Sequence, residues 1–173
     1  MNVLTNFKKI KAFVLDVDGV LTDGRVLLLN DGQMARSMHI KDGYALQLAV
    51  KKGYQVLVIS GGDDEAVKMR LQKLGVMDVH MKVTDKKTLL LEYVNKNALA
   101  WEQVLFMGDD IPDLQAMQIV GLPCCPADAV PEIKSISHYI SPINGGAGCV
   151  RDIIEKVMKL NGDWDTGTDI ASR

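Results

Sequence analysis

Two carboxylates two residues apart follow a short apolar run near the N-terminus. They are Asp16 and Asp18 in the stretch FVLDVDGVLTDG, residues 13–24. Because side chains two positions apart on an extended strand leave the same face, both carboxylates can act on one substrate. One can attack an electrophile while its neighbour moves protons. A DxD pair also occurs in ordinary acidic loops, so it gains weight only if other parts of the chain support it.

A second apolar run ends in a hydroxyl group and two glycines. The run YQVLVIS ends at Ser60, and Gly61 and Gly62 follow it ahead of a helix-like segment. Backbone N–H groups and the helix dipole at such a position favour a phosphoryl group. An ordinary strand-to-helix turn explains the same residues when they are considered alone.

A third apolar run ends in acids. The run QVLFMGDD ends in Asp109 and Asp110, and Asp113 follows shortly after. In an open parallel sheet, ligands bind outside the carboxyl ends of the strands, so three such endings predict one shared site. Oxygen ligands without cysteine or histidine favour a hard cation such as Mg²⁺. The pattern predicts attack of a carboxylate on a phosphate ester, which divides a very slow hydrolysis into two easier steps.

A cationic side chain is needed to offset the repulsion between these anions. Lys86, at the start of the segment DKKTLLLEY, is the candidate for this role. Lysines on helix surfaces are usually only solvated, and Lys82 or Lys87 can serve in its place.

The segments that must position these residues alternate between strand-like and helix-like. The three apolar runs lack polar alternation, which is typical of strands buried on both faces of a parallel sheet. Helix-like segments, which include charge patterns typical of helix ends, lie between or near them. They cover residues 42–53, 63–75 and 85–97. The alternation predicts a doubly wound α/β fold with a mostly parallel sheet.

One segment breaks this alternation. Two strand-like arms, 25–29 and 34–40, flank the Asn-Asp-Gly sequence at 30–32, which is a strong hairpin turn signal. We therefore expect a protruding β-hairpin over about residues 25–40. An ordinary surface hairpin would leave its leucines and methionines in water, so another subunit is the expected cover.

Composition limits the classes of function. The chain has 173 residues, of which 47% are hydrophobic, and a formal net charge of −2. This length predicts one domain over residues 1–160, and the polar end predicts a flexible tail at 161–173. The mixed charges offer no basic patch for nucleic acid, and no apolar stretch is long enough to span a membrane. A small molecule is the expected partner.

The N-terminus and the cysteines bear on location. The first residues lack the apolar block and cleavage site of a secretory signal, which predicts a cytoplasmic protein. The three cysteines have no CxxC spacing, so neither a disulfide framework nor a zinc site is indicated.

Four motifs together resemble the haloacid dehalogenase (HAD) superfamily of phosphotransferases. The family motifs are DxDxT/V, a Ser or Thr at a strand end, a Lys, and GDxxxD. They read here, in order, as DVDGVLTDG, VIS, TDKK and GDDIPD. The likeness runs from about residue 12 to the helix around residue 160 and implies a HAD-like Rossmannoid fold.

The resemblance implies a role for three of the aspartates. Asp16 would be the nucleophile and Asp18 the acid/base. Mg²⁺ would be held by Asp16, by the backbone carbonyl of Asp18 and by the carboxylate of Asp109.

The remaining motif residues would bind the phosphoryl group or support the metal. The resemblance implies that Ser60, Gly61 and Lys86 contact the phosphoryl group. Asp113 would orient the metal shell or the lysine, and Asp110 would lie in the outer metal shell at most. Ser60 stands where many relatives carry Thr, which keeps the hydroxyl group.

The sequence is more similar still to the small capless branch of this superfamily. That branch dephosphorylates 3-deoxy-D-manno-octulosonate 8-phosphate (Kdo 8-phosphate) in lipopolysaccharide biosynthesis. The likeness is carried by IKDGYALQLAVKKG, VKMRLQKLG and GGAGCVRD. It implies that no cap domain is present and that a homotetramer forms through the hairpin. It also implies that Arg70 reaches the sugar acid's carboxylate from a neighbouring subunit, although a solvent-facing Arg70 is an equal alternative.

Three other functions remain as alternatives. The first is a phosphatase for a nine-carbon 2-keto-3-deoxy sugar acid 9-phosphate, which would use the same catalytic residues. The second is a phospho-acceptor signalling module, although such modules accept phosphate on an aspartate at a later strand, where this chain has Ser60. The third is a non-catalytic subunit that binds a partner through the hairpin. The presence of both Asp16 and Asp18 argues against this third alternative.

Overall fold

A six-stranded sheet lies at the centre of the computed structural model, which describes residues 3–165, 167 and 170. Its strand order is β5-β4-β1-β6-β7-β8, and every neighbouring pair is parallel. The strands are β1 (Ala12–Leu15), β4 (Gln55–Ile59), β5 (Asp78–His80), β6 (Val104–Met107), β7 (Leu122–Cys125) and β8 (Tyr139–Ile140). The strands β1, β4 and β6 fall within the three apolar runs of the sequence.

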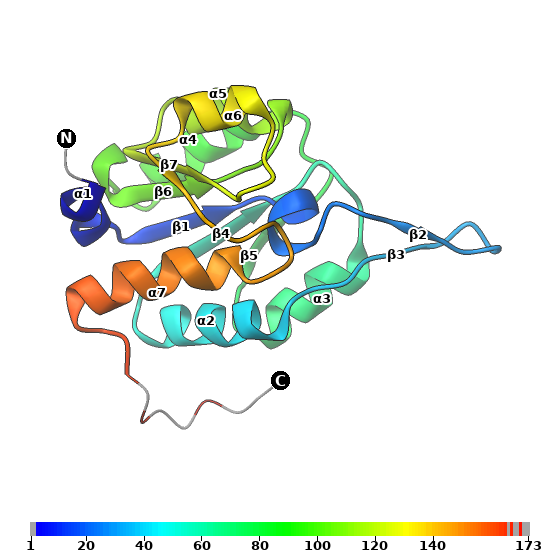
Figure 1. The fold of residues 1–173 in the computed structure, drawn as a ribbon, viewed down its shortest axis with the longest axis horizontal. Coiled ribbons are helices and arrows are strands. Elements are labelled where there is room, and N and C mark those ends of the chain that lie inside the picture. Colours follow the sequence, from blue (N-terminus) through cyan, green and yellow to red (C-terminus); the bar gives the residue numbers. More distant parts are fainter. Residues whose placement is uncertain (1–2, 166, 168–169, 171–173) are drawn as a thin grey trace.

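Helices cover both faces of this sheet (Figure 1). One layer contains α1 (Val3–Lys9), α2 (Ile40–Lys51), α3 (Glu65–Lys73) and α7 (Cys149–Asn161). The other contains α4 (Lys86–Lys96), α5 (Leu114–Met117) and α6 (Pro131–Ile136). This arrangement confirms the predicted doubly wound α/β fold.

The core consists of two apolar clusters, one on each face of the sheet. Successive residues of a strand point to opposite faces, so Phe13 and Leu15 of β1 join the cluster beneath α2 and α7. Val14, between them, joins the cluster beneath α4 and α5. All three are fully buried. The unbroken apolar runs of the sequence follow from this two-sided burial.

The hairpin after β1 is shorter in strand structure than the sequence predicts. Its strands are β2 (Leu27–Leu28) and β3 (Met34–Ala35), joined through a turn in which Gly32 has a φ of +82°. The predicted second arm, 34–40, is wrong in its last part because Ile40 begins α2. The His39 side chain starts that helix by accepting a hydrogen bond from the Lys41 N–H.

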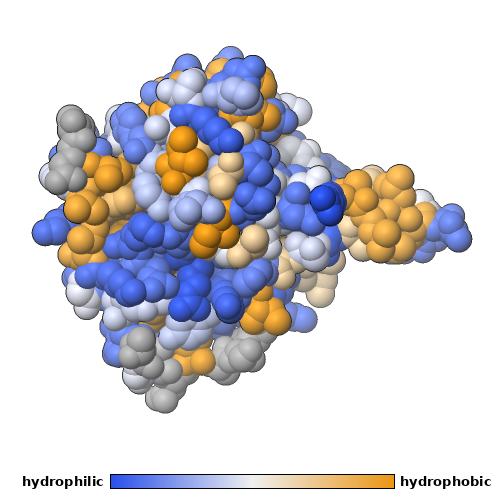
Figure 2. Space-filling view, viewed as in Figure 1, coloured by the Kyte–Doolittle hydropathy of each residue, from blue (hydrophilic) through white to orange (hydrophobic). Residues whose placement is uncertain are grey.

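The hairpin projects away from the body, and Figure 2 shows an apolar patch on it. Leu27 and Leu28 are 65% and 72% exposed, and Leu29 and Met34 are also exposed. Within the described residues, the chain between β1 and α2 carries this hairpin and no further domain.

The end of the chain contacts the body where it is described. The Tyr54 hydroxyl donates to Asp163, and the Trp164 ring lies edge-on to Tyr44 and beneath the Arg151 guanidinium. Residues 166, 168–169 and 171–173 of the predicted flexible tail lie outside the described residues, and its flexibility stays a prediction. None of the described helices is long and apolar enough to cross a bilayer.

Truncating a core residue should destabilise the fold strongly. Phe106 of β6 is fully buried between the sheet and the α4–α5 layer. We expect Phe106→Ala to lower the free energy of unfolding by about 3–5 kcal/mol, measured by denaturant titration. Met77, which is 71% exposed, serves as the control, because Met77→Ala should change that energy by no more than about 0.5 kcal/mol. A loss below about 1 kcal/mol for Phe106→Ala would contradict this packing.

Candidate active site

The carboxyl ends of β1, β4 and β6 meet at a pocket of about 360 Å³. The pocket brings together eight of the nine site residues that the sequence predicts. They are Asp16, Asp18, Ser60, Gly61, Lys86, Asp109, Asp110 and Asp113. The ninth, Arg70, lines a separate pocket between the hairpin and α3.

A buried lysine joins two of these acids. The Lys86 ammonium donates to Asp16 Oδ1 at 2.7 Å and to Asp113 Oδ1 at 2.6 Å. Lys86 is the first residue of α4, where Asp85 caps the helix by accepting from the Thr88 N–H. Burial by itself would lower the pKa of Lys86, but the charges of Asp113 and Asp16 outweigh burial and raise it. Lys86 is therefore the candidate lysine whose ammonium contacts the acids.

Three carboxylates crowd together beside this lysine. Asp16, Asp109 and Asp113 each offer an oxygen atom within 4.8 Å of the other two. Burial, followed by the charges of Asp16 and Asp113, raises the pKa of Asp109 to about 8. Burial, followed by the charge of Asp113, raises the pKa of Asp16 to about 6. The cluster thus carries more negative charge than Lys86 offsets.

The donor set of this cluster fits Mg²⁺. Asp109 Oδ1 is buried and has no hydrogen-bond partner among the described residues, which is costly unless a cation or water contacts it. All of the clustered atoms are carboxylate oxygens, the ligands that Mg²⁺ prefers. Asp113 is already engaged, because its Oδ2 accepts from the Asp109 N–H at 3.1 Å and its Oδ1 from Lys86. Asp16 and Asp109 are therefore the better placed metal ligands.

Two glycines allow the acids to approach the backbone. Gly19, with a φ of +90°, lies in the irregular turn after β1, and a Cβ there would overlap the Asp109 carboxylate. A Cβ on Gly108 would lie 2.6 Å from the Asp113 carboxylate. Neither glycine was predicted to have a role, although Gly19 lies in DVDGVLTDG and Gly108 in GDDIPD.

The loop after β4 has the conformation of a strand-to-helix turn. The Gly62 N–H donates to Ser60 Oγ at 3.1 Å, and Asp64 caps α3 by accepting from the Val67 N–H at 3.0 Å. The neighbouring loop supports this turn, since the Val83 N–H donates to the Ser60 carbonyl. Ser60 and Gly61 both line the pocket at the start of this turn.

Asp18 is paired with an arginine that the sequence analysis missed. Arg36 Nε donates to Asp18 Oδ1 at 2.7 Å, and a terminal nitrogen donates to Asp18 Oδ2 at 3.3 Å. Arg36 directly follows β3 of the hairpin. Its only sequence signal is that it is the sole charged residue of the arm 34–40.

Of the two remaining predicted residues, Asp110 lies at the margin of the pocket and Arg70 lies outside it. Asp110 is exposed, and its side chain accepts from the Ile111 N–H at 2.7 Å. Arg70 lies close to Gly43, where a Cβ would be 3.2 Å from a guanidinium nitrogen. Arg70 therefore does not line the candidate active site of its own chain.

Comparison with known proteins identifies the family. A family model for haloacid dehalogenase-like hydrolases matches residues 63–153. The 3-deoxy-D-manno-octulosonate 8-phosphate phosphatase KdsC of Salmonella typhi is 32% identical over 164 residues, which are 95% of this chain and 87% of the relative. The chain belongs to the haloacid dehalogenase-like hydrolases.

Solved structures of other haloacid dehalogenase-like hydrolases superimpose closely on this one. The 3-deoxy-D-manno-octulosonate 8-phosphate phosphatase of Moraxella catarrhalis, solved with a magnesium ion, a phosphate ion and a KDO molecule, is 29% identical with a TM-score of 0.88, and 91% of each chain is covered. The corresponding phosphatase of Yersinia pestis is 28% identical with a TM-score of 0.93 over 97% of this chain and 91% of the other. These relatives confirm the resemblance and the HAD-like fold inferred from the sequence.

The raised carboxylate pKa values predict how magnesium and pH affect stability. Folding raises the pKa of Asp16 from 3.8 to about 6 and the pKa of Asp109 from 3.8 to about 8. Between these pH values, the metal-free folded state therefore retains protons that the unfolded chain releases. Its stability should therefore fall as the pH rises from about 4 to about 8. Because Mg²⁺ binds the ionised carboxylates, the rise in Tm on adding Mg²⁺ should be larger at pH 8 than at pH 5, by about 2–4 °C or more. Calorimetry with EDTA or Mg²⁺ measures this difference.

The variant Asp109→Asn is the control for this experiment. It removes one carboxylate and one predicted ligand, so most of the magnesium-dependent rise should disappear. An equal rise at both pH values in the parent protein would contradict the assignment of these acids as the metal site.

Proposed function

We propose that the protein is a Mg²⁺-dependent phosphatase that hydrolyses Kdo 8-phosphate to Kdo and phosphate in lipopolysaccharide biosynthesis. The observation that carries this proposal is the pocket in which Lys86 holds Asp16 and Asp113 beside the Ser60 turn. It occurs in a chain that matches Kdo 8-phosphate phosphatases over nearly its whole length.

The first step uses the two acids of the first motif. Asp16 attacks the phosphorus atom, and the bond between phosphorus and the sugar oxygen breaks. Asp18 gives its proton to the departing sugar oxygen. The product is free sugar acid and a phosphoryl group bound to Asp16.

The second step returns both acids to their starting states. Asp18, now ionised, takes a proton from a water molecule as that water attacks the phosphorus atom. The bond between phosphorus and Asp16 breaks, and inorganic phosphate leaves. Asp16 is again a carboxylate and Asp18 is again protonated.

The surrounding residues hold the phosphoryl group and the charge. Lys86 keeps Asp16 in place and, with Ser60 and the Gly61 amide, binds the phosphoryl oxygens. Bound Mg²⁺ supplies positive charge against the accumulated anions. Asp16, the Asp18 carbonyl and Asp109 are the proposed ligands.

We also propose that four copies assemble through the hairpin. The exposed leucines of the hairpin support this, because such apolar surface is normally covered. Arg70 of a neighbouring copy would then bind the substrate carboxylate. A cytoplasmic location is part of the proposal, and the three free, buried cysteines support it.

Phosphate release tests the substrate and the metal. With Mg²⁺, we expect turnover of Kdo 8-phosphate to exceed that of the nine-carbon 9-phosphate and of simple sugar phosphates by at least about 10-fold in kcat/KM, a difference of about 1.4 kcal/mol. EDTA should abolish turnover of every substrate. Similar values for the eight- and nine-carbon substrates would contradict the proposed specificity.

The variant Asp16→Asn controls for contaminating phosphatases. It should lower turnover by at least about 10³-fold while Tm and assembly are preserved. Glu132→Gln, a neutralising change on the exposed face of α6, should keep full activity. Unchanged activity of Asp16→Asn would refute the assignment of Asp16 as the nucleophile.

Charge on the hairpin should disrupt the tetramer. We expect Leu27→Asp/Leu28→Asp to reduce the mass from four protomers to one or two, because two apolar side chains at the interface become charged. Light scattering after gel filtration measures this mass. Met77→Asp, at an equally exposed site outside the hairpin, should leave the mass unchanged. A monomeric parent protein, or a tetramer that keeps its mass after the double substitution, would contradict the proposed interface.

A further inference from the structure

The Arg36 side chain lines the separate pocket between the hairpin and α3, and it contacts Asp18 at the edge of the candidate active site. Three of its nitrogen atoms donate to two carboxylates: Nε and one terminal nitrogen to Asp18, and the other terminal nitrogen to Asp64 at 2.9 Å. Its side chain is only 11% exposed, whereas that of Asp18 is 38% exposed. Arg36 therefore lies beneath Asp18, and the Asp18 carboxylate remains open to the pocket.

The contact with Asp18 fixes an orientation. A guanidinium that binds both oxygen atoms of a carboxylate sets its plane as well as its position. Without it, the described partner of the Asp18 carboxylate is the Thr22 hydroxyl, at a long 3.4 Å. An exposed carboxylate with one weak contact samples several rotamers.

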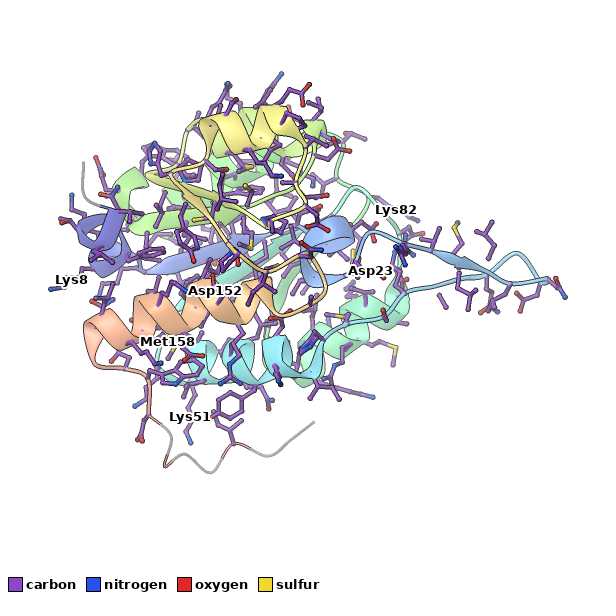
Figure 3. The ribbon with its side chains drawn as sticks, in the orientation of Figure 1. Lys8, Asp23, Lys51, Lys82, Asp152 and Met158 are labelled. Atoms are coloured by element: carbon purple, nitrogen blue, oxygen red, sulfur yellow. The ribbon has the colours of Figure 1, made fainter. Side chains whose placement is uncertain are left out.

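The contact with Asp64 anchors the arginine to the body. Asp64 accepts from Arg36 through Oδ2 while its Oδ1 caps α3. The same helix follows the Ser60 turn, so Arg36 connects the hairpin, the acid of the first motif and the turn of the second. Figure 3 labels Asp23 where the chain leaves the body for the hairpin, whose other side chains project outward on both sides.

The charges around Arg36 argue against a direct role in substrate binding. Asp18 and Asp64 already place two negative charges on one positive charge. An anionic substrate group would have to displace one of these carboxylates. Arg36 is thus better suited to hold Asp18 than to receive the sugar acid's carboxylate.

We propose that Arg36 is a positioning residue that orients Asp18 toward the leaving-group oxygen and makes this orientation depend on the placement of the hairpin. This inference rests on the proposed role of Asp18 as the acid/base. It adds a function for the hairpin within the protomer that differs from assembly.

Dependence on the leaving group tests this proposal. Protonation by Asp18 matters for a sugar oxygen, which leaves poorly, and hardly for nitrophenolate, which leaves as a stable anion. We expect Arg36→Met to lower kcat/KM by at least about 10-fold for the sugar phosphate that the parent enzyme turns over fastest. For p-nitrophenyl phosphate, the same variant should lose less than about threefold. Arg36→Lys should show a smaller but equally selective loss, because lysine keeps the positive charge but lacks the planar guanidinium that binds both carboxylate oxygens.

Two further variants separate the possible outcomes. Arg25→Met, an exposed arginine on the first arm of the hairpin, should leave both substrates unaffected. Asp18→Asn should show the same selective loss of kcat/KM as Arg36→Met. If Asp18→Asn instead loses equally on both substrates, the proposed acid role of Asp18 is refuted, but the contact between Arg36 and Asp18 is not. Equal losses on both substrates in the folded Arg36 variants, or no loss on either, would overturn the positioning role.

Discussion

The site depends on one buried ammonium group placed between two carboxylates. Lys86 comes from α4, Asp16 from the end of β1 and Asp113 from the segment after β6, and their contacts are 2.6–2.7 Å long. Removing one partner of such a buried pair leaves an uncompensated charge, which typically costs about 3–5 kcal/mol. The three elements must therefore meet with little freedom, and the two-sided apolar sheet supplies that rigidity.

The parallel sheet explains why the acids gather at all. The carboxyl ends of neighbouring strands lie at one edge, so residues far apart in the sequence become neighbours there. The price is a surplus of negative charge, visible in the raised pKa of Asp109. Bound magnesium would relieve this surplus, because a cation offsets part of it, whereas a bound phosphoryl group adds further negative charge. Asp18 lies outside this cluster of three acids, and its described charged partner is Arg36 from the hairpin.

Much of this arrangement follows from the sequence alone. The apolar runs predict the central strands, and the polar residues that end them predict the pocket, because burial and strand polarity are local properties of the pattern. The choice of Lys86 over its neighbour needed the structure, since only the start of α4 aims that side chain inward. Arg36 and the two glycines were not foreseen. The roles of Arg36 and Gly19 come from approaches between distant segments, which no spacing in the chain reveals, whereas Gly108 approaches Asp113 within the loop after β6. The end of the hairpin was misjudged because a histidine cap at residue 39 overrides the strand-like pattern.

Covalent capture of the phosphoryl group is the most direct test of the account. The parent enzyme would be mixed with ³²P-labelled sugar phosphate and Mg²⁺, quenched in acid within milliseconds, digested and sequenced by mass spectrometry. The account predicts transient label on the peptide that contains Asp16, at the carboxylate of that residue. Label on another side chain, or turnover without any labelled protein at every quench time, would contradict the assignment of Asp16 as the nucleophile.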